Sequence, residues 1–237
     1  MKKFLNFIIS IIFPRTCSLC GQTLSFSSKQ NICDKCLDNI PKLEGLLCHK
    51  CSLSLPDGGA TCSDCKNNRD ICFEVLKSPY TYSVQMRKLI KKLKYSRRTF
   101  LSQDLSAELA KFIIKENIDK NIDIVVPVPM HWFKKWKRGY NQAELLAKGV
   151  SLIINKPMYN ALVRTKYTKP QFNLKKQERY ENLENMFDLN KKYIDVIKGK
   201  RILLIDDIAT TCSTANQCAK VLKTLKIKTV VVTLARA

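Results

Sequence analysis

The stretch of sequence that decides the fold runs from residue 201 to residue 214 and reads Arg-Ile-Leu-Leu-Ile-Asp-Asp-Ile-Ala-Thr-Thr-Cys-Ser-Thr. The apolar run Ile202–Ile205 predicts a buried strand that ends in two adjacent carboxylates, Asp206 and Asp207. Small hydroxyl residues follow, and a helical pattern begins at Ala215. Ligands of α/β folds lie at the carboxyl ends of the strands, and a helix N-terminus attracts phosphate. This segment therefore predicts a phosphosugar site.

The same segment resembles the phosphoribosyl-pyrophosphate (PRPP) loop of type I phosphoribosyltransferases. Glycine is usual in that family at the position of Cys212, where it lets the backbone turn tightly toward a phosphate. A plainer alternative is that the two carboxylates cap an ordinary turn. The candidate PRPP-binding residues in this segment are Asp206, Asp207, Ala209, Thr210, Thr211, Cys212, Ser213 and Thr214.

The composition indicates a folded protein with a strongly basic surface. The chain has 237 residues, of which 45% are hydrophobic, and a formal net charge of +22. This hydrophobic fraction excludes a disordered chain, and the charge favours a polyanionic partner such as nucleic acid. A lysine-rich coding bias would produce the same excess, so charge alone does not identify the partner.

The first 16 residues combine Lys2 and Lys3 with an apolar run and imitate a signal peptide. The run ends at Pro14-Arg15 without a small-residue cleavage site, and it is shorter than the about 20 residues of a membrane span. We expect a short helix over residues 1–16 that packs on the protein, with a position on a membrane surface as the alternative. We expect no transmembrane span and a cytoplasmic protein.

Cysteines dominate the region that follows. Nine of the eleven cysteines lie between Cys17 and Cys72, and eight of these form four Cys-x-x-Cys knuckles. Two such knuckles supply the four sulfurs of one structural zinc site. Disulfides would need an oxidising compartment, so we expect two Zn²⁺ ions instead. Sequential pairing of the knuckles is the simplest arrangement, and interleaved pairing stays open. The expected ligands are Cys17, Cys20, Cys33, Cys36, Cys48, Cys51, Cys62 and Cys65.

Two segments combine cations in a way that suits nucleic acid. One is a basic helix near residue 90, and the other interleaves aromatic and cationic side chains from Trp132 to Arg138. Aromatic rings stack on bases while Lys and Arg meet phosphates. A solvated helix face and partly buried tryptophans are the alternatives. The candidate nucleic-acid contacts are Arg87, Lys91, Lys94, Arg98, Trp132, Lys134, Lys135 and Lys137.

Beyond residue 70 strands alternate with helices, which predicts a parallel sheet with right-handed crossovers. The expected strands are 75–82, 122–128, 161–164, 202–205 and 229–234. The expected helices are 84–95, 101–114, 141–154 and 215–225, and residues 165–187 are expected to form a polar loop. The predicted domains are an N-terminal apolar helix (1–16), a double zinc ribbon (17–70) and a phosphoribosyltransferase-like α/β domain (71–237).

Taken together, these stretches resemble the ComF family over essentially the whole chain. The resemblance rests on the cysteine knuckles and the PRPP-like loop, and on five further stretches. These stretches are Pro127-Val128-Pro129, the block from Arg138 to Ala147, Gln171, the group Glu178, Arg179, Asn182 and Phe187, and Leu234-Ala235-Arg236.

The ComF resemblance implies a fold, a process and roles for individual residues. ComF proteins pair an N-terminal zinc module with a type I phosphoribosyltransferase domain and act on single-stranded DNA in natural competence. In this sequence Asp206 and Asp207 would contact the ribose of PRPP directly or through Mg²⁺, and would be the catalytic residues of any transfer. Residues 210–214 would hold the 5′-phosphate, and Pro127–Pro129 would lie where pyrophosphate binds, with Arg138 as its cation.

Three functions remain open from the sequence. The first is a competence protein that binds PRPP and single-stranded DNA and works with other competence proteins. The second is an active phosphoribosyltransferase with an unidentified acceptor. The third is a PRPP-sensing adaptor without chemistry. His131 is a candidate general base for the second function, although nothing else in the sequence supports that role.

Overall fold

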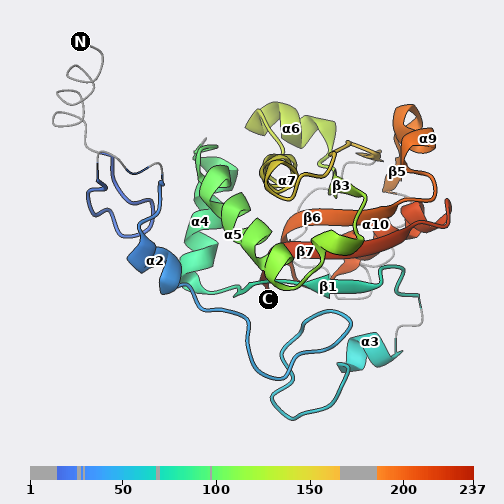
Figure 1. The fold of residues 1–237 in the computed structure, drawn as a ribbon, viewed down its shortest axis with the longest axis horizontal. Coiled ribbons are helices and arrows are strands. Elements are labelled where there is room, and N and C mark those ends of the chain that lie inside the picture. Colours follow the sequence, from blue (N-terminus) through green and yellow to red (C-terminus); the bar gives the residue numbers. More distant parts are fainter. Residues whose placement is uncertain (1–14, 26–27, 29, 68–69, 97, 166–185) are drawn as a thin grey trace.

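The centre of the molecule is a five-stranded parallel sheet. The computed structural model describes residues 15–25, 28, 30–67, 70–96, 98–165 and 186–237. In the sheet the strands are ordered β1-β7-β6-β3, and β2 also pairs with β7 (Figure 1). The strands are β1 (Val75–Lys77), β2 (Tyr80–Thr81), β3 (Ile124–Pro127), β6 (Arg201–Ala209) and β7 (Lys228–Arg236). Their near-continuous burial is what helices on both faces require.

Helices cover the two faces of this sheet and create two hydrophobic cores. Leu203 and Ile205 of β6 pack with α4, α5 and α7, whereas Ile202 and Leu204 pack with α10 on the opposite face. This alternation follows from the period of two in a strand. The helices are α4 (Val84–Tyr95), α5 (Leu101–Lys115), α7 (Gln142–Ile153) and α10 (Ser213–Lys223).

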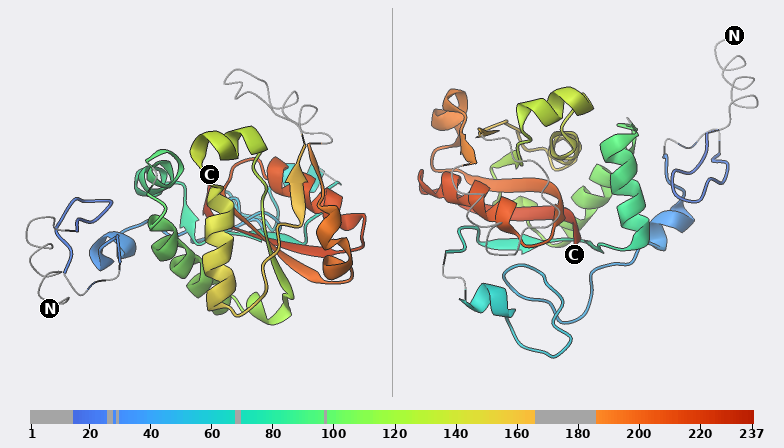
Figure 2. Two further views of the ribbon diagram at one scale, coloured as in Figure 1. Left: turned by 90° about the horizontal axis from the view of Figure 1, so that it is seen from above. Right: turned by 180° about the vertical axis from the view of Figure 1, so that it is seen from behind.

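Short elements surround this framework. An antiparallel pair, β4 and β5, stands apart from the main sheet, and the helix α6 follows β3. Figure 2 shows the same arrangement from above and from behind. The remaining elements are α2 (Asp34–Asp38), α3 (Ser63–Asn67), η1 (Asp119–Asn121), α6 (Trp132–Arg138), β4 (Leu162–Arg164), β5 (Phe187–Leu189), η2 (Lys191–Tyr193) and α9 (Ile194–Ile197).

The α/β class expected from the sequence is confirmed, with corrections at several element boundaries. The strand at residue 202 continues through both carboxylates to Ala209, and the following helix begins at Ser213 rather than Ala215. The aromatic stretch after residue 131 is a helix, which apolar periodicity did not predict.

Some expectations lie outside the described residues. The predicted N-terminal helix falls almost entirely on residues 1–14, and the polar loop falls on residues 166–185. Gln171, Glu178, Arg179 and Asn182, which contribute to the ComF resemblance, belong to that second segment.

Candidate functional site

The eight knuckle cysteines form two separate clusters. Within each cluster the four sulfurs lie within 4.8 Å of one another. The Sγ–Sγ distance is 3.9 Å between Cys20 and Cys33 and 3.7 Å between Cys51 and Cys62. A tetrahedral zinc site with Zn–S bonds of about 2.3 Å requires sulfurs about 3.8 Å apart. The clusters fit two structural zinc ions, and the sequential pairing is confirmed; they are Cys17/Cys20/Cys33/Cys36, the first zinc site, and Cys48/Cys51/Cys62/Cys65, the second zinc site.

The first zinc site is attached to α4 by lysine side chains. The ammonium of Lys88 donates to the carbonyl of Leu19 at 2.7 Å, and that of Lys92 donates to the carbonyl of Ser18 at 2.6 Å. Both carbonyls belong to the first knuckle, so part of the basic character of α4 serves an internal contact. These two cations have a structural role that the charge pattern did not indicate.

A buried carboxylate of α5 completes the attachment of the first zinc site. Asp104 is 8% exposed and accepts the backbone N–H of Asn31 at 2.6 Å. Burial raises the pKa of Asp104 despite this hydrogen bond. The segment before the second knuckle is thereby fixed to α5.

The second zinc site is attached to the sheet and to α10. The hydroxyl of Ser52 donates to the carbonyl of Leu76 in β1 at 2.8 Å. The side chain of Asn216 in α10 accepts the N–H of Cys72 at 2.7 Å. This site therefore lies against the strand edge and the helix that follows the PRPP-like loop.

The PRPP-like loop encloses a small cavity at the end of β6. The cavity has a volume of about 30 Å³ and is lined by Asp206, residues 208–215 and Thr233. All candidate loop residues from Ala209 to Thr214 are among those that line it. Hydroxyls, backbone amides and one carboxylate thus converge at the N-terminus of the 11-residue helix α10.

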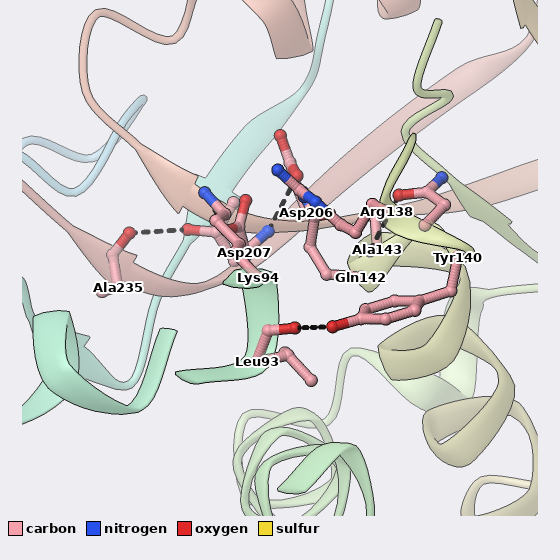
Figure 3. A network of polar contacts seen from close by, with 11 residues as sticks. Leu93, Lys94, Arg138, Tyr140, Gln142, Ala143, Asp206, Asp207 and Ala235 are labelled. Carbon is pink, nitrogen blue, oxygen red and sulfur yellow. Dashed lines mark hydrogen bonds and ion pairs between the residues drawn. The ribbon is translucent and has the colours of Figure 1, made fainter. Parts of the chain in front are cut away.

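The two adjacent aspartates have different surroundings (Figure 3). Asp207 is 4% exposed, and its carboxylate forms an ion pair with Lys94 of α4 at 2.5 Å. Burial acts to lower the pKa of Lys94, but the charge and hydrogen bond of Asp207 outweigh it, so the pKa is raised. Desolvation, and then the charge of Asp207, raise the pKa of Asp206 well above its ordinary value. Asp206 is the aspartate that lines the cavity, and Asp207 is the one held by α4.

Cys212 occupies a left-handed backbone conformation, with φ of 59° and ψ of 4°. This is the region that glycine adopts at no steric cost, so the chain makes the turn expected of the family with a cysteine in place of glycine. The side chain packs against the cluster of ligands that forms the second zinc site. Mainly because the Cys212 thiol donates to it, the pKa of Cys51 is lowered to about 4.

A larger open pocket of about 230 Å³ lies at the end of the neighbouring strand β3. Its lining includes Pro127 and Pro129, where the ComF resemblance implies pyrophosphate, and the cationic side chains of Lys135 and Arg164. Arg138, the expected pyrophosphate cation, lies outside the lining of both cavities. Its guanidinium stacks on the ring of Tyr95 at 5.2 Å from the centroid and donates to Gln142.

Some of the expected nucleic-acid residues are exposed, and others form ion pairs within the protein. In α4 Arg87 and Lys91 are exposed and Arg98 just beyond it is partly exposed, whereas Lys94 is held by Asp207 and does not belong to an open basic face. The expectation that Lys94 contacts nucleic acid is therefore corrected.

Helix α6 displays its aromatic side chains to solvent. Trp132 is 69% exposed and Trp136 is 76% exposed, and the ring of Trp136 stacks on Phe133 at 6.1 Å. Lys137 is exposed and Lys134 is partly exposed, whereas Lys135 forms an ion pair with Glu144 at 2.7 Å. His131 is buried as the N-cap of α6 and accepts the N–H of Phe133, so its ring has a structural role.

The sequence analysis missed the importance of Arg236. This residue is 6% exposed at the end of β7, and its guanidinium bonds both to the PRPP-like loop and to the second zinc site. The only sequence signal was its place in the terminal stretch that resembles ComF. Spacing could not have revealed contacts across 185 residues.

Comparison with known proteins first defines a class: residues 8–66 match the family model for the double zinc ribbon domain. The chain is 28% identical to competence protein F of Haemophilus influenzae, over 96% of both chains. It is 28% identical to the DNA utilization protein YhgH of Escherichia coli, over 88% of this chain and 91% of the relative. Competence protein ComFC of Bacillus subtilis is 28% identical, over 81% and 78%. The resemblance to the ComF family is confirmed, and the chain is a homologue of these competence proteins.

Among solved structures, the allosteric regulatory enzyme of purine biosynthesis aligns with a TM-score of 0.42 and 18% identity, over 62% of this chain and 30% of that one. An adenine phosphoribosyltransferase aligns with a TM-score of 0.38 and 17% identity, over 59% and 73%. Within the described part of the chain, no helix has the length and apolarity needed to span a membrane.

Proposed function

We propose that this protein binds PRPP with Mg²⁺ at the loop between β6 and α10, and that it handles single-stranded DNA in natural competence in the bacterial cytoplasm. The observation that carries the first part is the cavity in which Asp206 meets the hydroxyl-rich loop ahead of α10. The names of the relatives, two competence proteins and a DNA utilization protein, support the second part.

The residues of the site divide the recognition of PRPP between them. Asp206, which lines the cavity, accepts a ribose hydroxyl directly or ligates Mg²⁺, an ion that prefers carboxylate oxygens. Asp207 contributes from a position fixed by Lys94. Residues 210–214 offer hydroxyls and backbone amides to the 5′-phosphate at the positive end of α10.

Calorimetry with PRPP and MgCl₂ tests the PRPP site. Asp206→Asn should weaken binding about 100-fold or more, because a charge-assisted acceptor is lost where ligand charge is concentrated. Asp206→Asn with Asp207→Asn should abolish it. Asp195→Asn, which changes an exposed carboxylate in α9, serves as the matched control. Equal PRPP affinities for the wild type and Asp206→Asn would exclude this site.

The surface proposed to bind single-stranded DNA comprises α6 and α4, which contact each other. Arg138 at the end of α6 stacks on Tyr95 at the end of α4, and the hydroxyl of Tyr140 donates to the carbonyl of Leu93. These contacts connect α6, whose Trp132 and Trp136 are exposed, to the C-terminal end of the basic helix α4. Aromatic rings beside cations bind single strands by stacking and by phosphate contact.

Fluorescence anisotropy with a labelled oligothymidylate tests this surface. Trp136→Ala should weaken binding about 5- to 150-fold, because stacking on one base contributes about 1–3 kcal/mol. Replacing Arg87, Lys91 and Arg98 together should also reduce the dependence of affinity on salt. Leu152→Ala is the control, since Leu152 is another apolar side chain that is 74% exposed. If neither variant changes the affinity, DNA binds elsewhere or not at all.

A second candidate function is transfer of the phosphoribosyl group to an acceptor. The pocket of about 230 Å³ beside Pro127 favours it, because it offers room and cationic side chains next to the strand that carries Asp206. Transfer breaks the bond between the ribose anomeric carbon and pyrophosphate through a cationic transition state that carboxylates stabilise. Pyrophosphate release should then depend on an added acceptor. PRPP binding without release across acceptor classes would favour the sensing adaptor.

A further inference from the structure

The guanidinium of Arg236 contacts both the second zinc site and the PRPP-like loop. Nε of Arg236 donates to the carbonyl of Cys51 at 2.9 Å, and its Nη2 lies 3.7 Å from the Sγ of the same cysteine. Its Nη1 donates to the carbonyl of Ala209 at 3.2 Å and to that of Thr210. The same planar group therefore fixes a zinc ligand and the entry to the loop.

Cys212 makes a second connection between the loop and the second zinc site. Its backbone is left-handed, a conformation that costs a non-glycine residue about 1–2 kcal/mol. Its side chain packs against the ligands of the second zinc site. A small cavity lies between the two, lined by ligands of that site and by residues 211–213 of the loop. The contact with the zinc ligands offsets the backbone cost, so the position of the ligands helps to decide the conformation of the loop.

We propose that Arg236 and Cys212 are positioning residues that couple the second zinc site to the PRPP-like loop, so that zinc binding and PRPP binding reinforce each other. The inference rests on the proposed PRPP function and adds its control by the metal site. Groups that hydrogen-bond to metal ligands orient them and tune metal affinity, typically by about 10- to 100-fold. Coupling between two sites is reciprocal, so PRPP must then strengthen zinc binding by the same factor.

The first zinc site provides an internal control. Its described contacts go to α4 and α5 through Lys88, Lys92 and Asp104. PRPP should therefore act on the release of the second zinc much more than on the release of the first.

Chelator-driven zinc release from the full-length protein tests the coupling, with Cys33→Ser used to assign the phase of the second site. Saturating Mg²⁺–PRPP should slow release of the second zinc about fivefold or more. Arg236→Lys and Cys212→Ala should reduce this effect to less than about twofold, whereas Lys92→Gln should preserve it. Cys212→Ser, which retains a hydrogen-bond donor, should restore part of it. Wild-type protein that binds PRPP but releases the second zinc at an unchanged rate would overturn the coupling.

A readout without PRPP separates this inference from the proposed function. If calorimetry detects no PRPP binding by the zinc-loaded wild type, the proposed function fails. Amide hydrogen exchange of residues 210–216 then decides the coupling. Removing the second zinc from the wild type should raise exchange in this segment by about tenfold or more, and Arg236→Lys should raise it with both zinc ions bound. Exchange that is unchanged in both experiments would overturn the inference.

Discussion

The two four-cysteine clusters have the same ligands but different neighbours. The first lies against α4 and α5, where Lys92 and Asp104 bond to its backbone. The second lies against β1, α10 and the loop after β6, where Arg236 bonds to its ligand Cys51 and Asn216 bonds to Cys72 in the segment that follows it. Identical metal chemistry therefore supports a helical layer in one case and the candidate ligand site in the other. The motif predicts the metal, but only the neighbours show what the metal stabilises.

Removal of each metal in turn gives the largest expected effects. We expect two Zn²⁺ per chain by metal analysis, one in Cys33→Ser and one in Cys62→Ser, because a structural zinc contributes about 10–16 kcal/mol to its module. The second variant should lose PRPP affinity about 100-fold. The first should retain it within about threefold. Calorimetry with PRPP makes the measurement, and equal losses in both variants would contradict the division of roles.

Lys94 tests whether α4 connects the helical layer to the ligand site. Lys94→Met leaves the carboxylate of Asp207 buried without its ion-pair partner, so the free energy of unfolding should fall by about 3–5 kcal/mol. Urea unfolding measures it. Lys91→Met, three residues earlier and exposed, should change it by less than about 0.5 kcal/mol. Similar stabilities for the two variants would show that the ion pair is not maintained in solution.

Asp104 tests the attachment of the first zinc site alone. Asp104→Ala leaves the buried N–H of Asn31 without an acceptor, which should cost about 1–3 kcal/mol of the free energy of unfolding. Release of the first zinc should become faster, and PRPP affinity should not change. Lys111→Ala on the same helix is the control, because that side chain is 72% exposed. Faster release of the second zinc would argue against separate attachments.

Asp206 should make the stability of the ligand-site half of the molecule depend on pH. Its pKa is raised in the folded state, so it favours folding at low pH, and this contribution is lost as pH rises through the folded pKa. Asp206→Asn stays neutral, so it should become more stable than the wild type from about pH 4 upward, by about 1.4 kcal/mol for each unit of the pKa shift. Urea unfolding at several pH values measures the difference. A pH-independent difference would mean that the carboxylate is solvated.

Local patterns predicted the parts of the fold that depend on neighbouring residues. The helix over 84–95 and the strand over 162–164 were predicted almost to the residue, because each depends mainly on its own local sequence. The eight zinc ligands followed from their spacing, and the structure added which knuckles share an ion.

Long-range packing decided what the sequence could not reveal. Helix α6 has exposed tryptophans and no buried apolar stripe, so periodicity gave no sign of it. Lys94 belongs to a basic run in the sequence, and only the packing of α4 against β6 directs it to Asp207. The place of Arg236 likewise follows from docking of the zinc module on the sheet.

The exposed aromatic rings of α6 also determine what the tryptophan fluorescence of this protein can report. The chain contains two tryptophans, Trp132 and Trp136, and both lie on this helix. Tryptophan fluorescence, excited where tyrosine absorbs little, therefore originates on one helix and reports little on the zinc sites and the two cores. Because both indoles already face water, their emission will change little on unfolding, and circular dichroism is the better probe of stability. Quenching by an added oligonucleotide, by contrast, will need no label.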